Sequence, residues 1–277
     1  LPTGNTPHFP EAIAINPATG RVYVANSESN LVTVISHTTI LNQIPVDDTP
    51  VALTVDPIHG LIYVANRTSN TVSILDEQSG SVLRSIPVGD TPVAVYADAL
   101  TGWAYVVNRV GNSISVVDGL ALTLIQTIPV GQNPLAIAGD PSSGLVYVVN
   151  QVGNSVSIID GAQLTATITV GSSPVALVAT PNNHVYVASF GNATISVLAG
   201  PTLVSTIHNL PRLAHSSIEV LPDGRVVAAD LTGKEALFLD RQTVITTVKT
   251  ITSPQTLSTS PGREPLYEHL QVAHESI

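Results

Sequence analysis

Tyr23-Val24-Ala25-Asn26 returns forty residues later as Tyr63-Val64-Ala65-Asn66. Two further copies follow, at Tyr105-Val106-Val107-Asn108 and Tyr147-Val148-Val149-Asn150, with weaker ones at Tyr186-Val187-Ala188-Ser189 and Val227-Ala228-Ala229-Asp230. The tyrosines are separated by 40, 42, 42 and 39 residues. A period of about forty residues is typical of repeat architectures, in which each copy is one supersecondary unit.

Prolines mark the same period a second time. A pair of prolines seven residues apart opens and closes the first predicted strand of most copies: Pro10 and Pro17, Pro50 and Pro57, Pro134 and Pro141, Pro174 and Pro181, Pro254 and Pro261. In the third copy Ala99 replaces the closing proline, and in the sixth His215 replaces the opening one. The sequence therefore predicts seven copies, which begin near residues 10, 50, 92, 134, 174, 215 and 254.

Each copy has the pattern of four short strands. The second copy predicts strands over residues 51–55, 61–66, 71–75 and 82–88, rich in the β-branched residues that favour strands. The dipeptides Asp118-Gly119 and Asp160-Gly161 predict tight hairpins, because glycine tolerates the positive φ that such turns require.

Four-stranded units of this length cannot bury both faces alone, whereas seven packed radially close a ring. The sequence therefore predicts an all-β fold: one domain over residues 1–277, a seven-bladed β-propeller. Leu1-Pro2-Thr3-Gly4-Asn5-Thr6 resembles the strand end Ile86-Pro87-Val88-Gly89-Asp90-Thr91, so we expect the N-terminal residues to close the last blade as its outer strand. The alternative is that residues 1–9 form a loose tail.

Composition limits the partners. Charged residues are only 11% of the chain and the net charge is -10, without a basic cluster, so we expect no nucleic acid partner. Apolar runs are short and interrupted, which predicts no membrane span. The chain has no cysteine and begins at Leu1 rather than Met, which fits an exported protein, extracellular or periplasmic, and also fits a chain trimmed for another reason. We expect a monomer.

The Tyr-Val-Ala-Asn segments, together with the Pro-Val-Ala strand starts and Ile-Pro-Val-Gly strand ends, resemble the YVTN family of β-propellers over residues 10–250. The resemblance implies the fold. It leaves the function open, because members of that family include surface-layer and periplasmic binding proteins, lactonase-like enzymes and domains of redox enzymes.

Positions where one copy departs from its sisters need a reason other than the fold. The loops that lead into the first strands and the loops after the second strands share one rim of a propeller, here called the top. Polar departures gather there in copies six, seven and one, which a closed ring makes neighbours. They are His215, Ser216 and Glu219 with Arg212 before them, Gln255 and His269, and Glu11 with His8 before it. This arc predicts a polar pocket at the top of the central channel.

Within that pocket we expect His215, Glu219 and Glu11 as catalytic acid or base, since imidazole and carboxylate suit proton transfer. His8, His215 and His269 are candidate ligands of a divalent metal ion, the one cofactor that the sequence suggests. For substrate binding we expect Arg67 and Arg109 on adjacent top loops, with Tyr96, Arg212, Gln255 and Ser216. The alternative for the two arginines is that they are solvated loop residues. The alternative is that end repeats are atypical only because they close the ring.

Two functions follow. The first is an enzyme, a lyase or hydrolase that acts on a small organic molecule in this pocket. The second is a non-catalytic, exported binding or surface interaction module. The polar arc discriminates them, because catalysis needs its groups close together.

Overall fold

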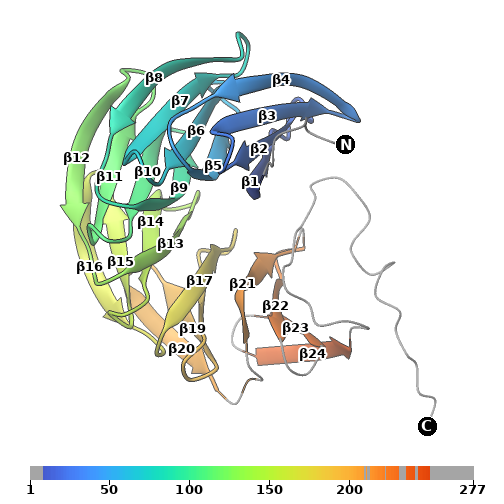
Figure 1. Ribbon diagram of the computed structural model, residues 1–277. Helices are drawn as coiled ribbons and strands as arrows, with labels where there is room; N and C mark the ends of the chain where they lie inside the picture. Colours follow the sequence, from blue (N-terminus) through green and yellow to red (C-terminus); the bar gives the residue numbers. More distant parts are fainter. Residues whose placement is uncertain are drawn as a thin grey trace. The chain divides into compact units, whose positions relative to one another are not determined.

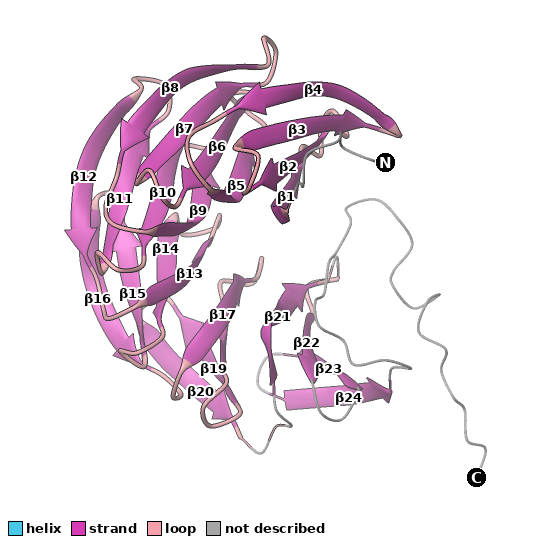
Figure 2. Cartoon of the chain, viewed as in Figure 1, coloured by secondary structure: helices cyan, strands magenta, loops and turns pink. Residues whose placement is uncertain are grey.

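The fold is all-β throughout the part of the chain that the computed structural model describes, namely residues 9–208, 210, 213–221, 223–230, 235–240 and 243–249. Figures 1 and 2 show strands and loops, and no helix occurs within those residues. The strands form four-stranded antiparallel sheets in which neighbours along the chain are neighbours in the sheet. Hairpin connections alone therefore build each sheet.

Six sheets are described, and their bounds follow the repeat. The first three are β1 (Pro10–Ile15), β2 (Val22–Asn26), β3 (Leu31–Ser36) and β4 (Thr39–Pro45); β5 (Pro50–Asp56), β6 (Leu61–Asn66), β7 (Thr71–Asp76) and β8 (Ser81–Pro87); β9 (Pro92–Asp98), β10 (Trp103–Asn108), β11 (Ser113–Asp118) and β12 (Thr123–Pro129). The next three are β13 (Pro134–Gly139), β14 (Leu145–Asn150), β15 (Ser155–Asp160) and β16 (Gln163–Thr169); β17 (Pro174–Ala179), β18 (Val185–Ser189), β19 (Thr194–Ala199) and β20 (Thr202–Ile207); β21 (Leu213–Val220), β22 (Val226–Asp230), β23 (Glu235–Asp240) and β24 (Thr243–Lys249). The predicted seventh blade and the N-terminal strand that would close it lie outside the described residues.

The described chain divides into two compact units. The first contains residues up to Ile137 together with 161–164, and the second contains 138–160 and the residues after 164. In the first unit the opening strands β1, β5 and β9 lie side by side, whereas the last strands β4, β8 and β12 have few contacts with one another. The three sheets of this unit are therefore closest at their first strands, and apolar clusters fill the space between them.

In each of the first four sheets an asparagine or aspartate builds the turn after the first strand, at Asn16, Asp56, Asp98 and Asp140. The Asp56 carboxylate accepts a hydrogen bond of 3.0 Å from the Ile58 amide, and Asp98 does the same for Leu100. Each of these four turns contains a glycine in the left-handed region, for example Gly60 at φ 65° and Gly102 at φ 73°, where a side chain would be strained.

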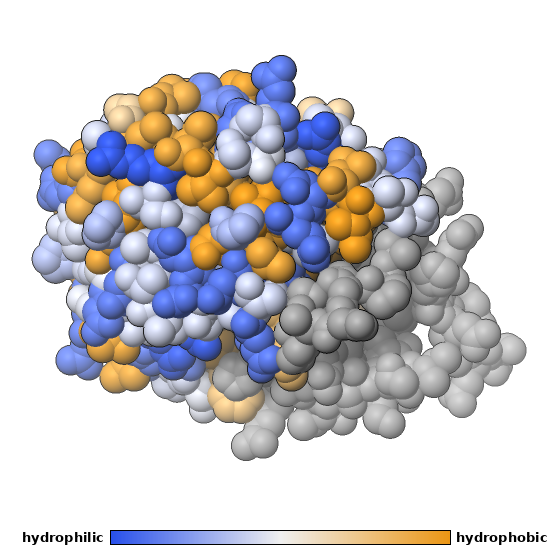
Figure 3. Space-filling view, turned by 45° about the horizontal axis from the view of Figure 1, so that its top comes forward, coloured by the Kyte–Doolittle hydropathy of each residue, from blue (hydrophilic) through white to orange (hydrophobic). Residues whose placement is uncertain are grey.

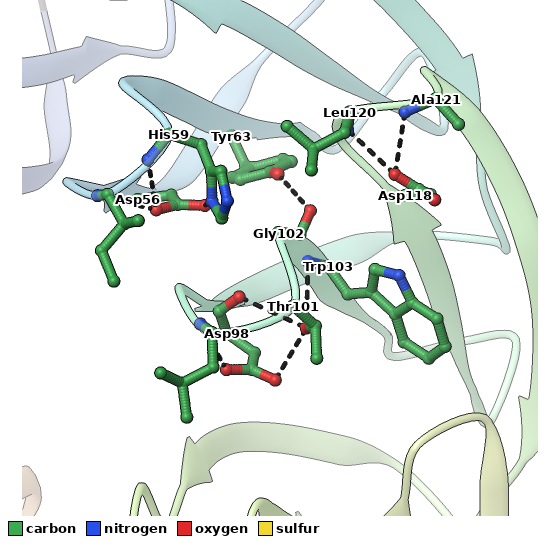
Figure 4. A network of polar contacts seen from close by, with 12 residues as sticks. Asp56, His59, Tyr63, Asp98, Thr101, Gly102, Trp103, Asp118, Leu120 and Ala121 are labelled. Carbon is green, nitrogen blue, oxygen red and sulfur yellow. Dashed lines mark hydrogen bonds and ion pairs between the residues drawn. The ribbon is translucent and has the colours of Figure 1, made fainter.

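The repeated tyrosines join one sheet to the next. Tyr63 is fully buried, and its hydroxyl donates a hydrogen bond of 2.8 Å to the Gly102 carbonyl in the following sheet (Figure 4). Burial raises the pKa of Tyr63 well above its ordinary value. In the preceding pair of sheets Glu77 stands where the third copy has Gly119, and Tyr23 donates to that carboxylate instead.

Tyr147 lacks this partner. Its hydroxyl is buried without a hydrogen bond. Six residues lead from Pro141 to Tyr147, whereas only five lead from Pro181 to Tyr186 in the next copy. The turn before Tyr186 is thus one residue shorter, and within the described residues none of its groups accepts a hydrogen bond from the Tyr147 hydroxyl.

Candidate functional site

A polar hollow lies on the top rim of the first unit and is here called the Glu11–Arg67 pocket. Its volume is about 630 Å³, which is within the usual range of small-molecule sites. It is bordered by the start of β1, the loops after β2 and β6, and the loop that leads into β5; the lining residues are Phe9, Glu11, Ser27, Glu28, Asn30, Asp48, Thr49, Arg67 and Thr68. Two residues singled out by the repeat analysis, Glu11 and Arg67, thus line one hollow.

Hydrogen bonds between loops hold the walls in place. The Asn30 amide group donates to Asp48 Oδ1 at 2.9 Å, and its oxygen accepts from the Thr49 backbone amide at 2.9 Å. Thr49 in turn accepts at its carbonyl from the Arg67 amide at 2.8 Å, and its hydroxyl lies 2.8 Å from that of Thr68. Because each loop is hydrogen-bonded to the next, the loops that carry the pocket's side chains are positioned before any ligand arrives.

The charged groups of the pocket have few partners of their own. The Glu11 carboxylate accepts one long hydrogen bond, 3.4 Å from the Ser27 hydroxyl. Glu28 is exposed. Within the described residues the Arg67 guanidinium makes neither an ion pair nor a side-chain hydrogen bond. A cation and several carboxylates therefore share one hollow without neutralising one another.

Arg109 differs from Arg67 although both follow the repeated asparagine. Arg109 Nε donates a hydrogen bond of 2.7 Å to Asn133 Oδ1 in the loop that leads to the next sheet. At the corresponding position before Pro92 the chain has Thr91, whose hydroxyl donates to Asp90. Of the two predicted arginines, Arg67 thus lines the pocket, whereas Arg109 is hydrogen-bonded to the loop before the next sheet.

Tyr96 lies in β9 directly opposite Tyr105 in β10. The two rings are 6.3 Å apart between centroids and tilted by 32°, a packing arrangement of aromatic side chains. Tyr96 does not line the Glu11–Arg67 pocket.

Glu219 lies in β21 of the second unit and is half-buried. Burial raises the pKa of this carboxyl, and no hydrogen-bond or ion-pair partner occurs for it within the described residues. His215 and Ser216 belong to the same strand, but their side chains lie outside the described part of the structure, as do His8, Arg212, Gln255 and His269. The predicted arc is therefore represented only by Glu11 and Glu219, one in each unit.

The half-buried Glu219 carboxylate gives a pH-dependent prediction. A raised folded-state pKa means that Glu219 disfavours folding once it ionises, so its contribution to stability falls as pH rises above about 4.3. We expect Glu219→Gln to have the wild-type melting temperature near pH 4 and a higher one near pH 7.5. Thermal unfolding at both pH values measures this, with Glu28→Gln as the exposed control. A lower melting temperature for Glu219→Gln at pH 7.5 would show that a partner stabilises the carboxylate.

Sequence reasoning missed the two other acids of the pocket, Glu28 and Asp48. A signal existed for Glu28, because the corresponding loop positions hold Thr68, Val110 and Val152. For Asp48 there was none, since the next copy also has aspartate, Asp90, at that position.

A metal centre is not apparent in the described residues, where no group of three His, Cys, Asp or Glu side chains converges. The predicted histidine ligands lie outside that part. A second, smaller hollow of about 140 Å³ surrounds Tyr23 and Glu77. There the Glu77 carboxylate accepts hydrogen bonds from Asn16, Thr19 and Tyr23, which join the first two sheets. Glu77 is therefore not free to bind a ligand.

The visible described surface mixes hydrophilic and hydrophobic residues (Figure 3). None of the described residues forms a helix with the length and hydropathy that a membrane crossing requires.

Comparisons with known proteins identify the architecture. No protein-family model matches the sequence, and no curated protein matches it significantly. Among solved structures, virginiamycin B lyase from Staphylococcus aureus is 13% identical with a TM-score of 0.75, over 91% of this chain and 89% of the lyase. Kuenenia stuttgartiensis hydrazine synthase is 17% identical with a TM-score of 0.70, over 92% and 91% of the two chains. A protein of unknown function from Desulfotomaculum acetoxidans is 12% identical with a TM-score of 0.73, over 92% and 90%. At such identities the likeness extends to the fold alone, and on that basis the chain is a β-propeller.

Proposed function

We propose that the protein is a seven-bladed β-propeller, closed by its N-terminal residues, that binds a small polar molecule in the Glu11–Arg67 pocket and acts on it as a lyase or hydrolase. The seventh blade is supported by the proline pair Pro254 and Pro261, which repeats the spacing of the earlier first strands. We also propose that the protein is monomeric and exported; its cysteine-free, weakly charged composition is compatible with export.

The observation that carries the proposal is that one hollow is lined by Glu11 and by Arg67, whose guanidinium has no partner among the described residues. Glu11 replaces the apolar residue found in its sister strands, Val51, Val93, Leu135 and Val175, so the fold does not explain it. A carboxylate at that place can accept a proton from a bound molecule, and a guanidinium can stabilise the negative charge that develops.

One feature favours the non-catalytic alternative. Glu11 and Arg67 are both exposed, whereas acid–base catalysis gains most where water is excluded. In this second reading the same pocket captures a ligand and returns it unchanged, and the propeller serves as a rigid platform.

A metabolite screen by thermal shift tests the proposal. We expect at least one small polar compound to raise the melting temperature of the wild-type protein, because a ligand that binds only the folded state stabilises it. The same compound should have little effect on Arg67→Ala, since the guanidinium is exposed and its removal leaves the walls intact. Arg84→Ala, which removes an exposed arginine from the outer strand β8, is the matched control. If every compound that stabilises the wild type stabilises Arg67→Ala equally, the pocket is not the binding site.

A further inference from the structure

The pocket has a charge pattern that no single group explains. Three carboxylates line it, Glu11, Glu28 and Asp48, against one guanidinium, Arg67, so its formal charge is -2. A pocket for a simple anion would not hold three carboxylates, because each repels the ligand. A pocket for a simple cation would have no use for an arginine beside them.

The opposite charges are also kept apart. No carboxylate lies within ion-pair distance of the Arg67 guanidinium in the described residues. Asp48 is held by the Asn30 amide and Glu11 by the Ser27 hydroxyl, both of which are neutral donors. In the structure the carboxylates and the guanidinium thus lie apart from one another around a hollow of about 630 Å³.

Separated charges of both signs around one hollow match a molecule that carries both signs itself. Such a ligand can place a carboxylate on Arg67, where a planar guanidinium offers two parallel N–H donors. Its ammonium groups can then lie against Glu11, Glu28 and Asp48. Electrostatic complementarity of this kind chooses among ligands more than it adds affinity.

We infer that the ligand of the Glu11–Arg67 pocket is a small ampholyte with more cationic than anionic groups, such as a short basic peptide with a free carboxylate. This inference rests on the proposed function, since it specifies the ligand class of the same pocket. The ligand's carboxylate binds Arg67, and its ammonium groups bind the three acids.

The dipeptide Lys-Lys is a suitable probe, because its three ammonium groups and one carboxylate are the complement of the pocket. Isothermal titration in low-salt buffer would compare it with its C-terminal amide, which lacks the carboxylate. We expect amidation to weaken binding to the wild type about tenfold, the worth of a charge-assisted hydrogen bond. In Arg67→Ala the amide should bind as well as the free acid, whereas Arg84→Ala should keep the wild-type preference. Glu28→Gln should weaken both peptides.

The outcomes separate this inference from the proposed function. Equal binding of Lys-Lys and its amide to the wild type, or no binding of Lys-Lys at millimolar concentration, would overturn the ampholyte class. If another compound from the screen still requires Arg67, the pocket remains the binding site and only the ligand class is wrong. If no compound requires Arg67, both proposals fail.

Discussion

Gly119→Ala is expected to lower the free energy of unfolding by about 2 to 4 kcal/mol, the combined cost of overpacking and of a lost buried hydrogen bond. A methyl group at this position would collide with the Tyr63 hydroxyl and lie 2.7 Å from Tyr63 Cζ and 3.0 Å from Leu61 Cδ1. Tyr63 is fully buried and bonded to Gly102, so it has no free direction in which to move (Figure 4). Urea unfolding followed by far-UV circular dichroism measures the change.

Tyr63→Phe provides the internal test of this cause. Alone, it should cost about 1 kcal/mol, because it leaves the Gly102 carbonyl without its donor. In the double variant the collision with the hydroxyl is gone, so the total loss should be smaller than the sum of the two single losses. Tyr147→Phe is the matched control, since its hydroxyl has no partner and its removal should cost almost nothing. Strict additivity of Gly119→Ala and Tyr63→Phe would show that the glycine is needed for another reason.

The turn at Gly119 also shows where sequence reasoning about the fold stops. The strands of the second copy were predicted to within a residue or two at each end, because tyrosine, asparagine and proline recur in register. The reason given for Gly119 was wrong. Gly161 does adopt a positive φ of 55°, in a turn of two residues between β15 and β16. The turn after β11 has four residues, and its positive φ falls on Leu122 at 57°.

Gly119 is required instead by a side chain 56 residues earlier in the chain, Tyr63. The neighbouring sheet that brings this tyrosine to the turn is a long-range feature, which no local pattern of turn residues encodes. Glu77 is a second case, because it accepts a hydrogen bond from Tyr23 of the preceding sheet. Only the packing of the two sheets brings these residues together.

The candidate site was predictable only where a repeat position changes its chemistry. Glu11 stood out because its sister positions are apolar, and Arg67 because it follows a repeated asparagine. The contrast between Arg67 and Arg109 could not be predicted, because it depends on whether the next loop offers Asn133 or Thr91 at hydrogen-bond distance. Whether an arginine on this rim has a hydrogen-bond partner therefore depends on how the loops pack, which the local sequence does not encode.

Glu11→Gln gives the second large effect, this time on catalysis. If Glu11 is the general base of the proposed lyase or hydrolase, Glu11→Gln should lower kcat for the substrate by about 100-fold or more. Binding should change much less, because Arg67 and the loop hydrogen bonds remain. The melting temperature should also stay near that of the wild type, since Glu11 is exposed and its one described hydrogen bond is 3.4 Å long.

The split between kcat and Kd separates a catalytic Glu11 from a structural one. Glu11→Gln should lower kcat while Kd and the melting temperature stay near those of the wild type, because only the group that removes the proton is lost. A ligand that binds in an Arg67-dependent manner and is recovered unchanged would assign the pocket to the non-catalytic alternative. Full activity of Glu11→Gln toward a substrate that still requires Arg67 would instead remove Glu11 from the mechanism, because the loss of a general base must lower kcat. The base would then have to be another group on the rim.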